Sequence, residues 1–285
     1  MKMNDSSQVF LFKDYYIVVP LLSSELSSAT SFIKNHHWFI DNGGKIVLKI
    51  GGIVESDQKL VLQNISAIIF LEIEDFSIYN AWNQALDFLD YINICKNSYI
   101  IFLGLDDILE EDYLKRVSSI TRRRNDIDFL YGDFKSVLGN YYRIFKSPQT
   151  PSLFKKNNFS FDVPHPGLVN NWSTIKNYRF SEEYRLGSDL DYYIRISKDR
   201  KITHKYIPVI QATIGANGIS NNYKAKSLYL NEWKLISSRN SVSLDLNFKR
   251  SYLLNLLSKS PNLFIFFRKI YWRIYGKRIE INRNL

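Results

Sequence analysis

The sequence predicts an α/β protein with a mostly parallel central β-sheet flanked by helices. Short runs of β-branched and aromatic residues alternate along the chain with longer segments that have helical apolar spacing. The central run, residues 99–103, is apolar at every position, which is typical of a strand buried on both faces of a parallel sheet. With 285 residues, of which 45% are hydrophobic, the chain is long enough to bury a substantial core.

Each expected element rests on a local signal. Apolar runs that end at proline, glycine or a polar turn predict strands at residues 15–20, 46–50, 67–71, 99–103 and 128–133. Helical spacing or a capping residue predicts helices at residues 23–35, 78–89, 113–124, 192–197 and 225–238. Turn residues near Gly139 predict a β-hairpin over residues 137–145, and two further strands are expected at residues 205–207 and 210–214. Ser77 is the expected cap of the helix that follows it.

The positive charge of the chain is concentrated near its end. The formal net charge is +10, and from Lys249 onward nine lysines and arginines stand against one acidic residue, Glu280. We therefore divide the chain into a main domain, residues 1–240, and a basic, aromatic-rich helical tail, residues 241–285. Such a tail suits peripheral contact with an anionic membrane surface. The alternative is a helix docked on the protein's own core or on a second subunit, and the charge favours the membrane.

Composition also excludes several classes of protein. The charge is confined to the tail and no nucleic-acid-binding motif is present, so we expect no nucleic-acid partner. A single cysteine excludes an intramolecular disulfide framework, and with four histidines it forms no zinc-binding pattern. The first residues lack an apolar run of the signal-peptide type, and no stretch has the length of a membrane-spanning helix.

Two adjacent carboxylates, Asp106 and Asp107, follow the central strand directly. In open α/β sheets, ligands bind outside the carboxyl ends of the strands. Carboxylates at such a place hold a hard divalent cation, with phosphate oxygens and water completing the coordination. The alternative is a turn that caps the next helix, which is the simpler reading of an isolated Asp-Asp pair.

Four short stretches carry a resemblance to a known enzyme family. Residues 77–85, Ser-Ile-Tyr-Asn-Ala-Trp-Asn-Gln-Ala, are similar to a family stretch that reads Gly-Ile-Tyr-Asp-Ala-Met-Asn-Lys-Gly. Residues 99–107 resemble a strand that ends in a metal-binding Asp-x-Asp signature. Residues 187–195, Gly-Ser-Asp-Leu-Asp-Tyr-Tyr-Ile-Arg, are similar to an acidic catalytic segment, and residues 215–220 to the glycine-rich turn after it. In this order they resemble family-two glycosyltransferases of the A-type nucleotide-sugar fold, most closely bacterial enzymes that build O-antigen or capsular repeat units.

The resemblance implies an inverting glycosyltransferase with a Rossmann-like A-type fold and a C-terminal helical extension. Its donor would be a nucleotide sugar, a UDP-hexose or UDP-N-acetylhexosamine, and its acceptor a polyprenyl-diphosphate-linked oligosaccharide of O-antigen (lipopolysaccharide) biosynthesis. It would work in the cytoplasm, peripheral to the inner face of the bacterial cytoplasmic membrane. Asp106, with Asp107 as second choice, matches the metal ligand for Mn²⁺ or Mg²⁺. Asp189 matches the general base, and Asp191 a carboxylate that binds the acceptor or supports the base. The other residues assigned to donor or acceptor binding are Pro20, Glu55, Asn80, Asn83 and His165.

The chain departs from the family pattern at three places. Gly104 stands where the signature has its first aspartate, and Ser188 stands where many relatives have glutamate. The usual Asp-Gly-x-Ser after the second strand, whose aspartate reads uracil, is Ile-Gly-Gly-Ile at residues 50–53, and Glu55 or backbone groups are the candidate substitutes. These departures give a rival interpretation: a catalytically silent subunit that binds a nucleotide sugar or glycan within an assembly complex.

Structural explanations compete with several functional ones. Asp189 also suits a plain helix cap, and His165, between two prolines, also suits a structural hydrogen-bonding residue. Trp82 and Trp172 have the stacking surface that a sugar or base needs, but core packing is the favoured interpretation of both.

Overall fold

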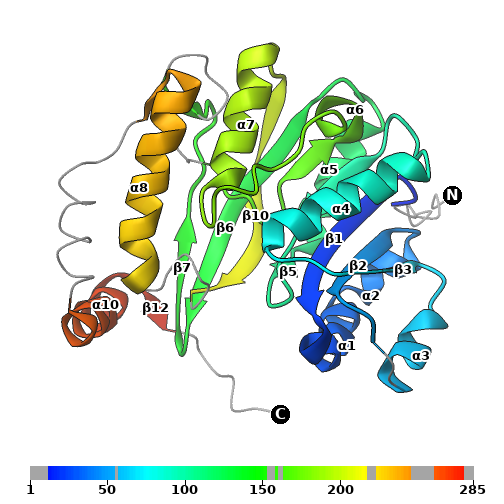
Figure 1. Cartoon of the computed structure of the whole chain (residues 1–285), viewed down its shortest axis with the longest axis horizontal. Helices are drawn as coiled ribbons and strands as arrows, with labels where there is room; N and C mark the ends of the chain where they lie inside the picture. Colours follow the sequence, from blue (N-terminus) through cyan, green and yellow to red (C-terminus); the bar gives the residue numbers. More distant parts are fainter. Residues whose placement is uncertain are drawn as a thin grey trace, which may run out of the picture.

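The computed structural model describes residues 12–54, 57–152, 158–159, 163–216, 223–244 and 260–278. Its centre is a ten-stranded mixed sheet in the order β12-β7-β6-β9-β4-β1-β2-β3, and β10 pairs with β6 and β5 beside this row. Helices cover both faces of the sheet (Figure 1). The α/β class predicted from the sequence is therefore confirmed, with a sheet that is partly antiparallel.

One half of the sheet is parallel, as expected. It contains β1 (Tyr15–Leu22), β2 (Lys45–Gly51), β3 (Ile68–Ile73) and β4 (Tyr99–Phe102). Neighbouring strands of this half all run parallel. Strand β1 does not stop at Pro20 but continues to Leu22, where it pairs only with β2, because β4 has already ended at Phe102. The carboxyl ends of these four strands form one edge of the sheet.

The other half contains the antiparallel strands. It is built from β5 (Ile108–Leu109), β6 (Phe129–Leu138), β7 (Tyr141–Phe145), β9 (Val169–Asn171), β10 (His204–Gly215) and β12 (Lys277–Arg278). The predicted hairpin is β6–β7, and its turn contains Gly139 with φ +54°. The two strands expected around residue 208 form the single strand β10, whose register shifts between Tyr206 and Ala212. Pro208 lies inside this irregularity, because a residue without an N–H cannot continue the ladder there. A separate parallel pair joins β8 (Asn158–Phe159) and β11 (Ser243–Leu244).

The helices lie where the apolar spacing predicted most of them. They are η1 (Ser23–Glu25), α1 (Leu26–Asn35), α2 (His37–Asp41), α3 (Asp57–Gln63), α4 (Ile78–Tyr91), α5 (Glu111–Thr121), α6 (Trp172–Ile175), α7 (Ser188–Asp199), α8 (Tyr223–Asn240) and α10 (Pro261–Tyr275). Ser77 caps α4 as predicted, since its Oγ accepts a hydrogen bond from the N–H of Asn80 at 3.1 Å. Helices α4 and α7 pack on one face of the sheet, and α1 and α5 pack on the other.

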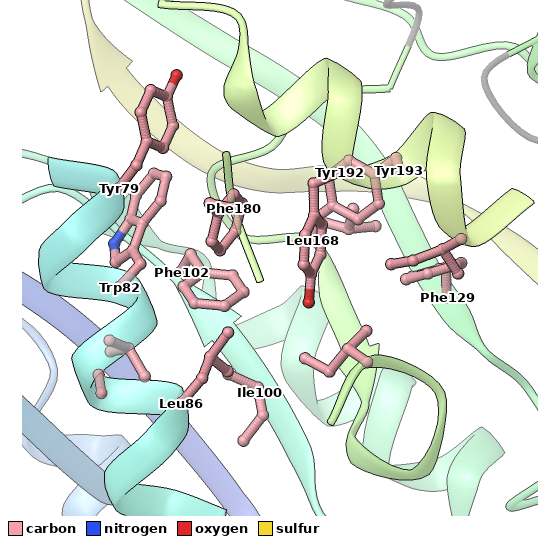
Figure 2. Packing of buried hydrophobic residues seen from close by; sticks show 14 of the residues in the cluster. Tyr79, Trp82, Leu86, Ile100, Phe102, Phe129, Leu168, Phe180, Tyr192 and Tyr193 are labelled. Atoms are coloured by element: carbon pink, nitrogen blue, oxygen red, sulfur yellow. The ribbon is translucent and has the colours of Figure 1, made fainter. Parts of the chain in front are cut away.

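An aromatic cluster joins α4, β4 and α7 (Figure 2). The Trp82 ring lies 5.3 Å from Phe102 and 5.1 Å from Phe180 between centroids, and Phe180 stacks on Tyr192 at 4.2 Å. Trp82 and Trp172 are 6% and 3% exposed, so packing in the core, the favoured interpretation, is the use that the structure shows. The cluster fixes α7 relative to the end of β4, and both elements carry candidate site residues.

The tail helix α10 is attached to the sheet. Phe264 and Trp272 are buried, and the Arg143 guanidinium on β7 lies 4.6 Å from the ring centroid of Tyr271 and hydrogen-bonds its hydroxyl. After α10, strand β12 pairs antiparallel with β7 at the edge of the sheet. Among the described residues, no helix is long and apolar enough to cross a membrane.

Candidate active site

The two carboxylates that follow β4 differ in environment. Asp107 is buried, and its Oδ2 accepts a 2.7 Å hydrogen bond from the N–H of Gly104. Burial, with a smaller contribution from the charge of Asp106, raises the pKa of Asp107 to about 7, and the bond from Gly104 opposes part of this rise. Asp106 is exposed at the end of β10, where its Oδ2 lies 3.0 Å from the position that a Cβ would take at Gly215. Asp106 is therefore the more accessible of the two expected metal ligands, and Asp107 closes the turn.

Gly104 faces both carboxylates. A Cβ built at this glycine would lie 3.1 Å from Asp107 Oδ2 and 3.3 Å from Asp106 Oδ1. In the part of the chain that the structure describes, no three His, Cys, Asp or Glu side chains form a metal-binding group. A single accessible carboxylate still fits a Mg²⁺-type site in which diphosphate oxygens and water supply the other ligands.

Asp189 lies in the first turn of α7, where its side chain is half-buried. Burial raises the pKa of its carboxyl group to about 7, Glu232 adds to the rise, and hydrogen bonds from backbone N–H groups oppose it. One of these is the 2.8 Å bond from Leu190 N–H to Oδ1. Tyr79 and Tyr229 are nearby: burial raises the pKa of both, and the Asp189 carboxylate is the next contribution in each. Asp189 is thus a carboxyl group that titrates near neutral pH among protonated tyrosine hydroxyls.

Glu232 on α8 holds the turn that leads into Asp189, and sequence reasoning missed it. Its Oε1 accepts a hydrogen bond from Arg185 N–H at 2.7 Å, and its Oε2 accepts bonds from Leu186 and Gly187 N–H at 2.9 and 2.8 Å. The residue is 7% exposed, so these three bonds satisfy a buried carboxylate. A lone glutamate in a helix gives no local sequence signal that it contacts backbone groups far away along the chain.

Three other predicted site residues are engaged with the protein itself. Asp191 accepts from Arg195 Nε at 2.8 Å and from Asn240 Nδ2 at 2.9 Å, so it links α7 to α8. Asn83 exchanges hydrogen bonds with the backbone of Phe180, and both Asn83 and Asn80 donate to Glu182 Oε1. Of the roles expected for Asp191, this geometry fits support of the base. The two asparagines tie α4 to the segment before α7.

His165 is buried between the end of β4 and helix α7, the two elements next to which the candidate carboxylates lie. Its ring stacks on Phe102 at 5.4 Å between centroids and lies 4.8 Å from Trp82. The Nδ1 atom of His165 is 3.2 Å from the hydroxyl of Tyr193, and that hydroxyl donates a hydrogen bond to Asn170. The Nε2 atom of His165 has no hydrogen-bond partner among the described residues. Burial lowers the pKa of His165 to about 3, so the imidazole is neutral. The residue therefore connects the end of β4 to α7 and carries one unsatisfied nitrogen.

Gln211 on β10 positions the His165 loop and also escaped sequence reasoning. Its side-chain N–H groups donate to the carbonyls of Pro164 and Pro166 at 3.0 and 2.7 Å. Its Oε1 accepts from Gly132 N–H at 2.6 Å. The fully buried amide thus spans β6, β10 and the loop. Nothing in the sequence around Gln211 distinguishes it from other polar residues in a strand.

At the ends of β1–β3, an acidic residue lies beside the expected base-binding turn. Asp75 Oδ2 would lie 3.0 Å from a Cβ at Gly51, and it accepts a 2.7 Å bond from the buried Lys49 Nζ. Lys49 also donates to the carbonyls of Ile50 and Ile73. Asp75, which sequence reasoning missed, therefore fills the space that a side chain at residue 51 would need. Pro20 lies opposite Lys49 on β1, and Glu55 lies outside the described residues.

A cavity of about 400 Å³ opens away from these groups. Tyr15 and Tyr99, which open β1 and β4, line it together with Arg122 and Asn125. It therefore belongs to the amino-terminal edge of the strands, opposite the candidate site.

Solved structures with the same fold include proteins bound to nucleotide sugars. S. aureus TarS 1-349 in complex with UDP-GlcNAc has a TM-score of 0.54 and 13% identity, covering 85% of this chain and 70% of that one. A longer TarS structure matches with a TM-score of 0.53, but the chain spans only 42% of its length. The mannosyltransferase PcManGT from Pyrobaculum calidifontis, in complex with GDP-Man and Mn²⁺, has a TM-score of 0.51 and 9% identity, covering 79% of this chain and 63% of that one.

Sequence comparison adds nothing to these structures, since no protein-family model and no curated protein matches the chain. At 9% and 13% identity, the likeness concerns the fold. The fold that this chain shares with them is the Rossmann-like, A-type glycosyltransferase fold.

Proposed function

We propose that the protein is an inverting glycosyltransferase that moves a sugar from a nucleotide donor to a hydroxyl group of a glycan. The observation that carries the proposal is Asp189, a carboxyl group whose pKa is raised by burial to about 7. It opens α7 in a fold shared with proteins that bind UDP-GlcNAc and GDP-Man. A general base works best when its pKa lies near the working pH.

In the proposed reaction, Asp189 takes the proton of the acceptor hydroxyl while the hydroxyl oxygen attacks C1 of the donor sugar. The bond from C1 to the diphosphate breaks, and the diphosphate leaves with the bonding electrons. Attack opposite to the leaving group inverts the configuration at C1. Tyr79 and Tyr229 stay protonated beside Asp189 and offer hydrogen bonds to the sugars.

Asp106, supported by Asp107, is the residue that we propose to hold Mn²⁺ or Mg²⁺. The bound cation would neutralise charge on the leaving diphosphate. The accessible Asp106 carboxylate at the end of β10 supports this choice, and PcManGT, with the same fold, was solved with Mn²⁺.

For the donor base, we propose that Asp75 takes the role of the missing aspartate after β2. Its carboxylate occupies the space beside Gly51, and the ion pair with Lys49 holds it in place. A carboxylate accepts hydrogen bonds from the N–H groups of uracil or guanine. We favour a UDP-hexose or UDP-N-acetylhexosamine as the donor, from the family resemblance.

We further propose a polyprenyl-diphosphate-linked oligosaccharide as the acceptor, in bacterial O-antigen or capsular biosynthesis at the inner face of the cytoplasmic membrane. The proposal rests on the family resemblance, and the basic, aromatic tail is compatible with it.

The proposed function is tested by nucleotide release from a panel of UDP-sugars and GDP-mannose, with Mn²⁺, Mg²⁺ or EDTA and short glycan acceptors. We expect cation-dependent release from one donor, accelerated by an acceptor. An Asp199→Asn variant, changed at the far end of α7, should match the wild type, and Asp189→Asn should not. Donor binding without turnover for every combination would reject the enzyme.

That last result would favour a second candidate, a silent nucleotide-sugar-binding subunit. Two observations speak for it: Gly104 replaces a carboxylate, and Asp107 is turned back to Gly104 N–H. Calorimetry with UDP and with UDP-sugars separates the candidates, because the silent subunit would bind both without consuming either.

A further inference from the structure

We propose that the outward face of α10 binds an anionic lipid surface and holds the protein flat against it. This proposal goes beyond the proposed glycosyl transfer and does not depend on it. It rests on the side chains that α10 leaves exposed, on the charge around them and on how the helix is anchored.

The helix α10 has apolar side chains on two faces, and the described part of the chain covers only one of them. Phe264 and Trp272 are 7% exposed and pack against the protein. On the other side, Leu263, Phe266, Phe267 and Ile274 are 45–66% exposed. Their spacing of three, one and seven residues places them, with Ile270, along a single stripe of the helix. A stripe of large apolar side chains that faces solvent indicates a binding surface.

The charge around this stripe selects the partner. Residues 260–278 contain five lysines and arginines and no acidic residue. Of these, Lys269, Arg273, Lys277 and Arg278 are exposed. Aromatic residues beside exposed cations are the composition of helices that lie in the interface of anionic membranes. A second copy of this chain would bring the same cations against themselves, which opposes self-association through this face.

The anchoring of α10 makes it a fixed element of the protein. Tyr271 contacts Arg143 on β7, and the Arg268 guanidinium donates to the carbonyl of Ala216 just after β10. Figure 1 shows α10 at the outer edge of the molecule, where it contacts β7 and leads into β12. The 15 residues span about 22 Å at about 1.5 Å each, which suits a helix lying along a surface.

The same contact relates the surface to the candidate site. Ala216 follows Gly215, and a Cβ at Gly215 would lie 3.0 Å from Asp106 Oδ2. A membrane bound to the outward face of α10 therefore approaches the end of the sheet that carries Asp106. A lipid-linked acceptor would be delivered to that end.

Vesicle flotation with the full-length chain tests the proposal. Vesicles of phosphatidylcholine alone are compared with vesicles containing about 30 mol% phosphatidylglycerol, which supplies the negative surface charge that attracts lysine and arginine. We expect the wild type to float with the anionic vesicles and to be released by high salt. A Lys269→Gln/Arg273→Gln variant should partition about twenty-five-fold less, at about fivefold per lost charge. A Phe266→Ser/Phe267→Ser/Ile274→Ser variant should lose binding at any salt concentration.

Two matched controls remove the same kinds of side chain elsewhere. Leu60→Ser/Val61→Ser/Tyr91→Ser removes three exposed apolar residues away from α10, and Lys96→Gln/Arg123→Gln removes two exposed charges. Both should float like the wild type. The proposal is overturned if the wild type stays unbound, or if controls and α10 variants partition equally. It is also overturned if sedimentation equilibrium shows a dimer that the Phe266/Phe267/Ile274 substitutions dissociate, because a second copy then covers this face.

Discussion

Replacing Asp189 with asparagine should slow sugar transfer and stabilise the fold at the same time. Asparagine keeps the size of the side chain and an oxygen for the N–H of Leu190. It removes the proton acceptor, whose contribution is typically a factor of about 10² to 10⁴ in rate. In the wild type, the rate should rise as pH increases through about 7, where Asp189 becomes ionised. The variant should lack this rise.

The stability change follows from the same pKa. The carboxyl group has an ordinary pKa of 3.8 and a folded-state pKa of about 7, so the folded state binds the proton more tightly. The contribution of Asp189 to stability is therefore fully present below pH 3.8 and is lost as pH rises through 7. At about 1.4 kcal/mol per pK unit, the loss is at most about 4 kcal/mol. It is smaller to the extent that the α7 N-terminus and residual solvent access stabilise the charge.

Urea unfolding at pH 4 and pH 8 measures this difference without any substrate. We expect Asp189→Asn to match the wild type at pH 4 and to exceed it at pH 8, while Asp199→Asn shows no such change. If the difference in unfolding free energy between Asp189→Asn and the wild type is the same at pH 4 and pH 8, and turnover is normal, the reasoning is refuted. Asp189 would then be a solvated helix cap. Normal turnover alone would exclude Asp189 as the base.

Three further changes test the surroundings of the site. Gly104→Asp should place a third carboxylate beside Asp106 and Asp107, lowering the melting temperature in EDTA and restoring it with Mn²⁺; the same temperature in both conditions would contradict a cation site here. Glu232→Gln replaces one accepting oxygen by a donor that faces backbone N–H groups, so urea unfolding should show a loss of about 1–3 kcal/mol. Because the Glu232 charge raises the pKa of Asp189, the midpoint of the pH–rate profile should also move to lower pH in this variant. An unchanged midpoint would show that Glu232 does not influence the titration of Asp189. Asp75→Asn should lower the affinity for UDP, measured by calorimetry, more than the affinity for inorganic diphosphate. An equal effect on both would show that Asp75 only forms the structural ion pair with Lys49.

The sequence predicted those parts of the fold that depend on local patterns. The four parallel strands are mostly apolar runs, Ser77 is a good cap, and Gly139 has the positive φ that the hairpin turn needs. Strand β9 was not predicted, because its three residues, Val169–Asn171, have no periodicity of their own. They form a strand only because β4 and β6 lie on either side of them.

The sequence predicted those candidate site residues whose side-chain type and place next to a strand or helix end are both visible locally. Asp106 follows an apolar strand and Asp189 opens a helix, and both signals are local. Glu232 and Gln211 were missed because their partners lie 45 to 79 residues away and are backbone groups, which leave no mark on the sequence. The inward turn of Asp107 was equally hidden, since it depends on the N–H of a glycine.

The pairing of β12 with β7 has a consequence for the making of this protein. Strand β7 forms an outer edge of the sheet, and the residues that cover it, Lys277 and Arg278, are reached only more than 130 positions after Phe145. Contacts between such distant segments form late, and an uncovered strand edge is a template for aggregation. A growing polypeptide therefore carries this open edge until residues 277–278 are synthesised. A chain that stops before residue 260 should accumulate in inclusion bodies, and chaperones that shield strand edges should matter most before residues 277–278 are made.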